Sequence, residues 1–188
     1  MGRWEPNSRG RLEQAALELY GERGFEQTTV AEIARRAGLT ERTFFRYFAD
    51  KREVLFAGAA SLEALFVSTV SGAPESAAPL DAVAKALEVV AGAFQERHAY
   101  ARERQKAIIA NAELRERELI KLASLSAALA DALRLRGVAE PAASLTAEAG
   151  VAVFKVAFER WIEEENERDL WHLIQESLDE LRAVMAGN

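Results

Sequence analysis

The sequence contains no cysteine and only two histidines, His98 and His172, among its 188 residues. A chain without cysteine has no disulfide scaffold, no thiolate metal site and no cysteine nucleophile. Two histidines are too few for a histidine-rich metal centre, and neither has a second ligand at metal-binding spacing. We therefore expect neither a metal ion nor another cofactor.

Long apolar runs are also missing. No stretch approaches the roughly 18–20 consecutive apolar residues of a membrane span. The basic N-terminal segment 1–11 has no apolar stretch behind it, unlike a secretory signal peptide. We expect a cytoplasmic protein that does not bind a membrane and that is long enough to bury a sizeable core.

Proline is scarce, and sustained strand alternation is absent. The four prolines all lie at plausible element boundaries. Alanine and leucine, both good helix formers, dominate, and apolar residues recur at helical spacing. The sequence therefore predicts an all-α protein of about nine helices, at residues 8–23, 30–37, 41–47, 50–70, 80–97, 100–110, 113–136, 141–165 and 169–185.

Charge is divided unevenly along the chain, which carries a formal net charge of −6. Residues 1–56 hold ten Lys/Arg and nine Asp/Glu, whereas residues 57–188 hold 14 and 21. The segments 3–11 and 35–52 are locally basic. A negative body repels DNA phosphate while a locally basic tip attracts it. Charge alone is equally compatible with an ordinary mixed surface.

Residues 29–51 carry the most informative motif. Thr29 and Glu32 form a capping box at a helix start, and Gly38 supplies a sharp turn before a second helix capped by Thr40. The small Ala34 permits close approach of the two helices. Apolar residues flank the turn, and polar or aromatic ones face outward on the second helix: Thr40, Arg42, Thr43, Arg46 and Tyr47. This spacing predicts a helix-turn-helix.

The run from Thr28 to Leu55, TTVAEIARRAGLTERTFFRYFADKREVL, resembles the N-terminal domain of TetR-family transcriptional regulators. The preceding YGERGF at 20–25 is also similar, so that the resemblance covers about residues 9–56. The rest of the chain is similar in helix number and length. The resemblance implies a helix-turn-helix DNA-binding domain at 1–52 and a helical ligand-binding and dimerisation domain at 53–188.

The resemblance further implies a homodimer that reads a palindromic operator in double-stranded DNA, with its third helix in the major groove. Arg42 and Arg46 are expected at base edges or phosphates, because arginine pairs bidentately with guanine. Thr43 is expected at a phosphate or a thymine methyl group, and Lys51 matches a phosphate-contacting position. The full set of expected DNA contacts is Thr28, Thr29, Thr40, Arg42, Thr43, Arg46, Tyr47 and Lys51, with Arg3 and Arg9 in an N-terminal arm.

The chain departs from the family pattern after the turn, which is usually Gly-Thr-Leu-Tyr-x-His-Phe. Residues 42–48 read RTFFRYF instead. Phe45 thus replaces a tyrosine that often bonds a phosphate, and we expect Tyr47 to take over that contact. Arg35 and Arg36 are equally compatible with a solvated surface and with phosphate contact.

The predicted body contains apolar residues suited to an apolar effector, which family members commonly bind between their fourth and eighth helices. The candidate lining residues are Leu62, Phe66, Phe94, Tyr100, Ile109, Leu125, Phe154 and Phe158. Any helical core would show the same residues, so core packing is the alternative. The last two helices are apolar on more than one face, which indicates a dimer interface at Val153, Trp161, Trp171, Ile174 and Leu178. Packing of both helices within one subunit is the alternative.

These features favour a homodimeric repressor released by a small, largely apolar effector. A helical adapter with a degenerate DNA-binding head is the alternative. An enzyme ranks last, because the sequence shows no Ser/His/Asp arrangement, phosphate loop or metal-spaced cluster.

Overall fold

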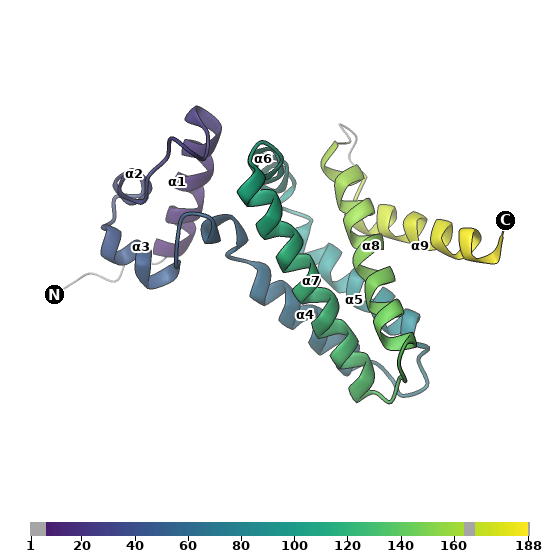
Figure 1. Ribbon diagram of the computed structural model, residues 1–188. Coiled ribbons are helices and arrows are strands. Elements are labelled where there is room, and N and C mark those ends of the chain that lie inside the picture. Colours follow the sequence, from purple (N-terminus) through teal and green to yellow (C-terminus); the bar gives the residue numbers. More distant parts are fainter. Residues whose placement is uncertain (1–6, 164–167, 188) are drawn as a thin grey trace. The chain divides into compact units, whose positions relative to one another are not determined.

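The computed structural model describes residues 7–163 and 168–187. These residues form nine α-helices and one 3₁₀ turn, with no strand among them, which confirms the all-α prediction (Figure 1). The elements are α1 Ser8–Arg23, α2 Val30–Arg36, α3 Glu41–Tyr47, η1 Glu53–Phe56, α4 Ala59–Ser71, α5 Pro79–Phe94, α6 His98–Ile109, α7 Ala112–Leu135, α8 Ala142–Glu163 and α9 Leu170–Ala186.

The chain divides into two compact units. The head unit comprises residues up to Ala59 together with Glu103–Leu119, and the body unit comprises Ala60–Arg102 and the residues from Ile120 onward. This division by packing differs from the functional boundary expected after residue 52. The functional boundary stays a prediction.

The single helix expected over residues 50–70 is instead divided into η1 and α4. Asp50 still caps this region, because its carboxylate accepts hydrogen bonds from the backbone N–H groups of Arg52 at 2.8 Å and Glu53 at 3.2 Å. Gly58, a poor helix former, lies between η1 and α4.

By length and apolar composition alone, the stretch Glu53–Ser71 is also sufficient to cross a membrane. Its buried side chains are Val54, Leu55, Phe56, Phe66 and Val70.

The head unit is built around α1, which packs against α2, α3 and η1. Tyr20 of α1 is buried, and its hydroxyl donates to the backbone oxygen of Lys51 at 2.6 Å. Burial raises the pKa of this phenol. The distant segment 103–119 is fastened to the same core, because Arg104 Nε donates to the backbone oxygen of Leu55 at 2.6 Å.

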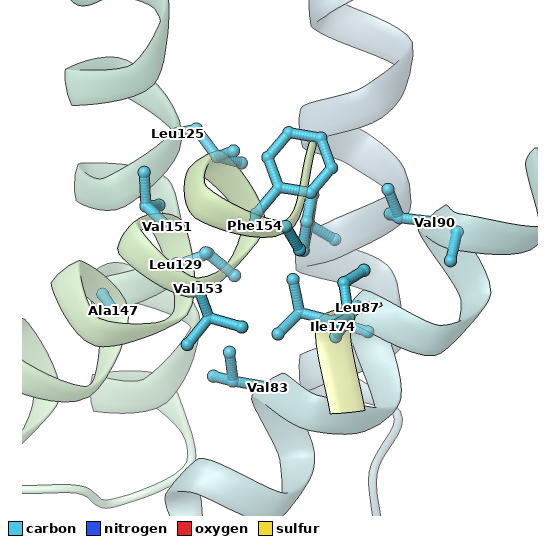
Figure 2. Close-up of a cluster of buried hydrophobic side chains, with 14 of the residues drawn as sticks. Val83, Leu87, Val90, Leu125, Leu129, Ala147, Val151, Val153, Phe154 and Ile174 are labelled. Carbon is cyan, nitrogen blue, oxygen red and sulfur yellow. The ribbon is translucent and has the colours of Figure 1, made fainter. Parts of the chain in front are cut away.

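The body unit has its core where α5, α8 and α9 pack on one another. Figure 2 shows Val83 and Leu87 of α5 pointing toward Val153 of α8 and Ile174 of α9. The approach of α5 to α8 is close at Gly150, where an added Cβ would lie 2.4 Å from Val83 Cγ1. An alanine at this crossing would have to displace the Val83 side chain, so the packing favours glycine.

Candidate nucleic-acid interface

The helices α2 and α3 form the predicted helix-turn-helix. Thr29 Oγ1 accepts from the backbone N–H of Glu32 at 3.3 Å, and Glu32 Oε2 accepts from that of Thr29 at 2.9 Å, completing the capping box. Gly38 makes the turn with φ of +66°, in the left-handed region that favours glycine. Thr40 caps α3 by accepting from the backbone N–H of Thr43 at 3.1 Å. Local sequence signals therefore place both helices.

The orientation of α3 is set by Phe44, which is fully buried in the head core. Arg42, Phe45 and Arg46, at i, i+3 and i+4, are consequently exposed together on the opposite side. The Arg46 guanidinium lies 4.9 Å from the Tyr47 ring centroid, and Arg46 Nη2 donates to the Tyr47 hydroxyl at 3.2 Å. We name the exposed residues Arg42, Phe45, Arg46 and Tyr47 the α3 outer face.

Two of the expected DNA contacts, Thr28 and Lys51, have hydrogen-bond partners inside the protein. The Thr28 side chain is fully buried, and its hydroxyl donates to the backbone oxygen of Gly24 at 2.9 Å. The Lys51 ammonium donates to the backbone oxygens of Phe25 at 2.8 Å and Thr28 at 3.0 Å, with a longer bond to Glu26 at 3.4 Å. Through these bonds the Lys51 ammonium closes the α1–α2 loop.

Arginines on the neighbouring helices have different surroundings. The Arg36 guanidinium holds Glu22 through two 2.8 Å hydrogen bonds and lies 3.4 Å from Glu18. These bonds lower the pKa of the Glu22 carboxyl. Arg9 pairs with Glu13 at 3.1 Å and also donates to the backbone oxygen of Ala57 in the head unit. Arg3 lies outside the described residues.

Four of the expected ligand-lining residues meet in one aromatic cluster of the body unit. Phe94 of α5 lies at its centre, with ring centroids 6.0 Å from Phe154 and 5.7 Å from Phe158 of α8. Phe66 of α4 joins at 5.9 Å from Phe154. Trp161 completes the cluster at 6.2 Å from Phe94. We name these five residues the aromatic cluster.

The other expected lining residues lie at different places. Leu125 is buried in the body core, and Leu62 is half-buried against it. The Tyr100 ring is covered by the Arg97 guanidinium at 5.2 Å. Ile109 lies apart from the other expected lining residues, because it belongs to the head unit and is 60% exposed. Its neighbour Ile108 is the one that helix periodicity turns inward.

The expected dimer-interface residues pack mostly within the single chain. Val153, Trp161, Ile174 and Leu178 are buried within the single chain, while Trp171 is half-buried against the same core. The first four side chains are therefore covered by their own subunit, whereas Trp171 keeps part of its surface exposed. The outward side of α8 exposes a different stripe at spacings of four, three and four residues: Leu145, Ala149, Ala152 and Val156. Ala149 is half-buried and the other three are exposed.

The head unit contains a helix-turn-helix, and it is followed in sequence by a helical body that contains an aromatic cluster. This combination is typical of DNA-binding regulators. A model described as bacterial regulatory proteins of the TetR family matches residues 13–57, and one described as the MftR C-terminal domain matches residues 77–186. The second model alone covers more than half of the chain. The chain therefore belongs to the TetR family of bacterial regulatory proteins.

Individual relatives agree with this assignment. The HTH-type transcriptional regulator TcmR of Streptomyces glaucescens is 36% identical over 85 residues, which is 45% of this chain and 38% of TcmR. FadR of Thermus thermophilus, a TetR-family repressor solved with lauroyl-CoA, is 25% identical with a TM-score of 0.50, over 94% of this chain and 93% of FadR. FadR of Bacillus subtilis, solved with stearoyl-CoA, shares the fold at 21% identity, with a TM-score of 0.57 and coverage of 90% and 95%.

Proposed function

We propose that the protein is a homodimeric, cytoplasmic transcriptional repressor that binds a palindromic DNA operator and is released by an apolar effector. The observation that carries the proposal is the α3 outer face, where Arg42, Arg46 and Tyr47 are exposed on a helix fixed from behind by Phe44. Arginine side chains on a helix of this kind reach base edges and phosphates in the major groove.

The distribution of charge favours binding at this face. The whole chain carries a net charge of −6, which opposes non-specific binding to DNA phosphate. Arg36 is neutralised by Glu22, whereas Arg42 makes no ion pair within residues 7–163 and 168–187. Thr29, Thr40, Thr43 and Arg9 remain proposed backbone contacts beside it.

The effector we propose carries an acyl chain. The aromatic cluster offers an apolar, polarisable lining in the body unit, and two structures of similar fold, both named FadR, were solved with lauroyl-CoA and stearoyl-CoA. We expect lauroyl-CoA to raise the melting temperature of the protein by mass action. A Phe94→Ala variant that melts cooperatively but no longer responds to lauroyl-CoA would support the site.

The dimer we propose is formed by the α8 stripe of Leu145, Ala149, Ala152 and Val156. The two central alanines allow two helices to approach closely, and the larger residues at the ends supply buried apolar area. Pairing across a two-fold axis presents the same stripe from both subunits.

The experiment that tests this function is selection of bound duplexes from a random library at about 150 mM salt, close to physiological ionic strength. A recovered palindrome supports the proposal. Arg46→Ala should then weaken binding by roughly 1–3 kcal/mol, whereas Lys85→Ala, on exposed α5 surface, should leave it unchanged. Absence of enrichment with a folded dimer that carries no co-purified ligand would favour an adapter with a degenerate head.

A further inference from the structure

The α3 outer face contains one uncharged, apolar residue whose exposure is not explained by electrostatic attraction to DNA. Phe45 is 56% exposed between Arg42, three residues before it, and Arg46, which follows it directly. Its ring stands edge-on against buried Phe44, with centroids 5.4 Å apart and planes at 82°. A large apolar ring is thus held in water at the middle of the surface that the proposed function brings to DNA.

The chemistry of phenylalanine restricts what this ring can recognise. It has no polar atom, so it neither donates to a phosphate nor pairs with a donor or acceptor on a base edge. The apolar group that the major groove displays is the C5-methyl group of thymine, and phenylalanine is among the side chains that contact it. Cytosine lacks this methyl group, and so does deoxyuridine, which otherwise presents the same edge as thymine.

We propose that Phe45 is a specificity-determining residue that contacts a thymine methyl group in each operator half-site. The inference rests on the proposed DNA binding. Phe44 limits the positions open to the ring, because its own side chain is fixed in the core. Arg42 and Arg46 on the same face supply polar recognition beside it, so that the face reads an apolar group flanked by hydrogen-bond acceptors.

The test uses the full-length protein and the palindrome recovered by selection. Each thymine of the half-site is replaced in turn by deoxyuridine, in both halves, and Kd is measured by fluorescence anisotropy at about 150 mM salt. Loss of one buried methyl group corresponds to about a fourfold loss of affinity per half-site. We expect this loss at one thymine position for the wild-type protein.

Variants then assign the effect to Phe45. In Phe45→Ala the affinities for thymine and deoxyuridine at that position should become equal, whereas Phe45→Leu should restore part of the preference because it keeps an apolar side chain. Tyr47→Phe, the control on the same helix, should keep the full preference. Because Phe45 is exposed, Phe45→Ala is expected to fold, and its melting temperature verifies this.

The outcomes separate the two proposals. A protein that binds its palindrome but is indifferent to deoxyuridine at every position overturns the role of Phe45 and leaves the DNA-binding function intact. A methyl preference that persists in Phe45→Ala overturns it as well. A protein that selects no duplex overturns both proposals.

Discussion

The guanidinium of Arg117 in α7 pairs with the carboxylate of Glu53 in η1, with Nε and Oε1 2.5 Å apart. The two residues are 64 positions apart in sequence, and both side chains are only partly exposed. Together with the hydrogen bond from Arg104 to Leu55, this pair joins the segment 103–119 to the helices of the head unit. The fold of the DNA-binding head therefore depends on residues far outside the recognised motif.

Removing this ion pair should destabilise the head unit. We expect Arg117→Ala to lower the free energy of unfolding by about 1 kcal/mol, because a partly buried pair is screened less than an exposed one. The control is Lys106→Ala, which removes the exposed pair with Glu103 on α6 and should cost only about 0.3 kcal/mol. Urea unfolding measures both, and equal losses would contradict the role of Arg117.

Replacing the turn glycine Gly38 should destabilise the protein, whereas replacing Gly21, the control, should stabilise it. Gly38 has φ of +66°, and an added Cβ would lie 2.7 Å from Nη2 of Arg11. Gly38→Ala should therefore cost about 1–2 kcal/mol. Gly21, inside α1, has open space around it, so that Gly21→Ala should stabilise the protein by about 0.5–1 kcal/mol. A stabilised Gly38→Ala variant in urea unfolding would show that the turn does not need glycine.

Helix ends and the turn were predictable because their signals are local. The Thr29–Glu32 capping box and the Thr40 cap involve residues three apart, and the expected bounds of α1 and α3 agree with the structure. The partners of Lys51 were not predictable, since the backbone oxygens of Phe25 and Thr28 lie more than 20 residues away in sequence. Thr28 bonds locally to Gly24, but its burial depends on how the head unit packs. No sequence signal marks which donors tertiary structure will use.

The burial of the expected interface residues within the subunit was not predictable for a related reason. A helix that is apolar on several faces does not reveal which stripe its own subunit covers. In α8 the bulky Phe154 and Trp161 lie inward, and the smaller Ala152 and Val156 lie outward. The clustering of the aromatic side chains likewise depends on how α4, α5 and α8 pack, although each aromatic residue was identifiable singly.

The crossing of α5 and α8 should respond to added volume. Gly150→Ala forces a methyl group against Val83 and should cost about 1–3 kcal/mol. Val83→Ala alone leaves a cavity and should cost roughly 2 kcal/mol. The double variant should lose less than the sum, because the new methyl group occupies the space that Val83 vacates. Strict additivity in a double-mutant cycle of urea unfolding would contradict this packing.

The head unit should lose stability in acid. The backbone N–H and hydroxyl of Thr29 lower the pKa of the Glu32 carboxyl, and hydrogen bonds from Arg52 lower that of Asp50. Carboxyls with a lowered folded pKa stabilise the protein above their unfolded pKa, about 4.5 for Glu, and lose this contribution as pH falls through the folded value. The melting temperature should consequently fall below about pH 4.5.

The variant Glu32→Gln measures how much Glu32 contributes to the decrease of the melting temperature in acid. It keeps an acceptor oxygen for the capping box but does not titrate, so its melting temperature should decline less steeply between pH 5 and pH 3 than that of the wild type. Glu75→Gln, in the exposed loop before α5, should leave the decline unchanged. Identical profiles for Glu32→Gln and the wild type would exclude Glu32 as a source of acid sensitivity.

The α8 stripe gives the sharpest test of the dimer. Val156 is 49% exposed in the single chain, so that Val156→Glu should not disturb the fold. In a dimer the same carboxylate is buried without a partner, which strongly disfavours association. Sedimentation should therefore show folded monomers for Val156→Glu and dimers for Lys155→Glu, which adds a carboxylate one residue away. Trp161→Glu should instead unfold the body, because Trp161 is buried within the subunit. A Val156→Glu variant that stays dimeric would place the interface elsewhere.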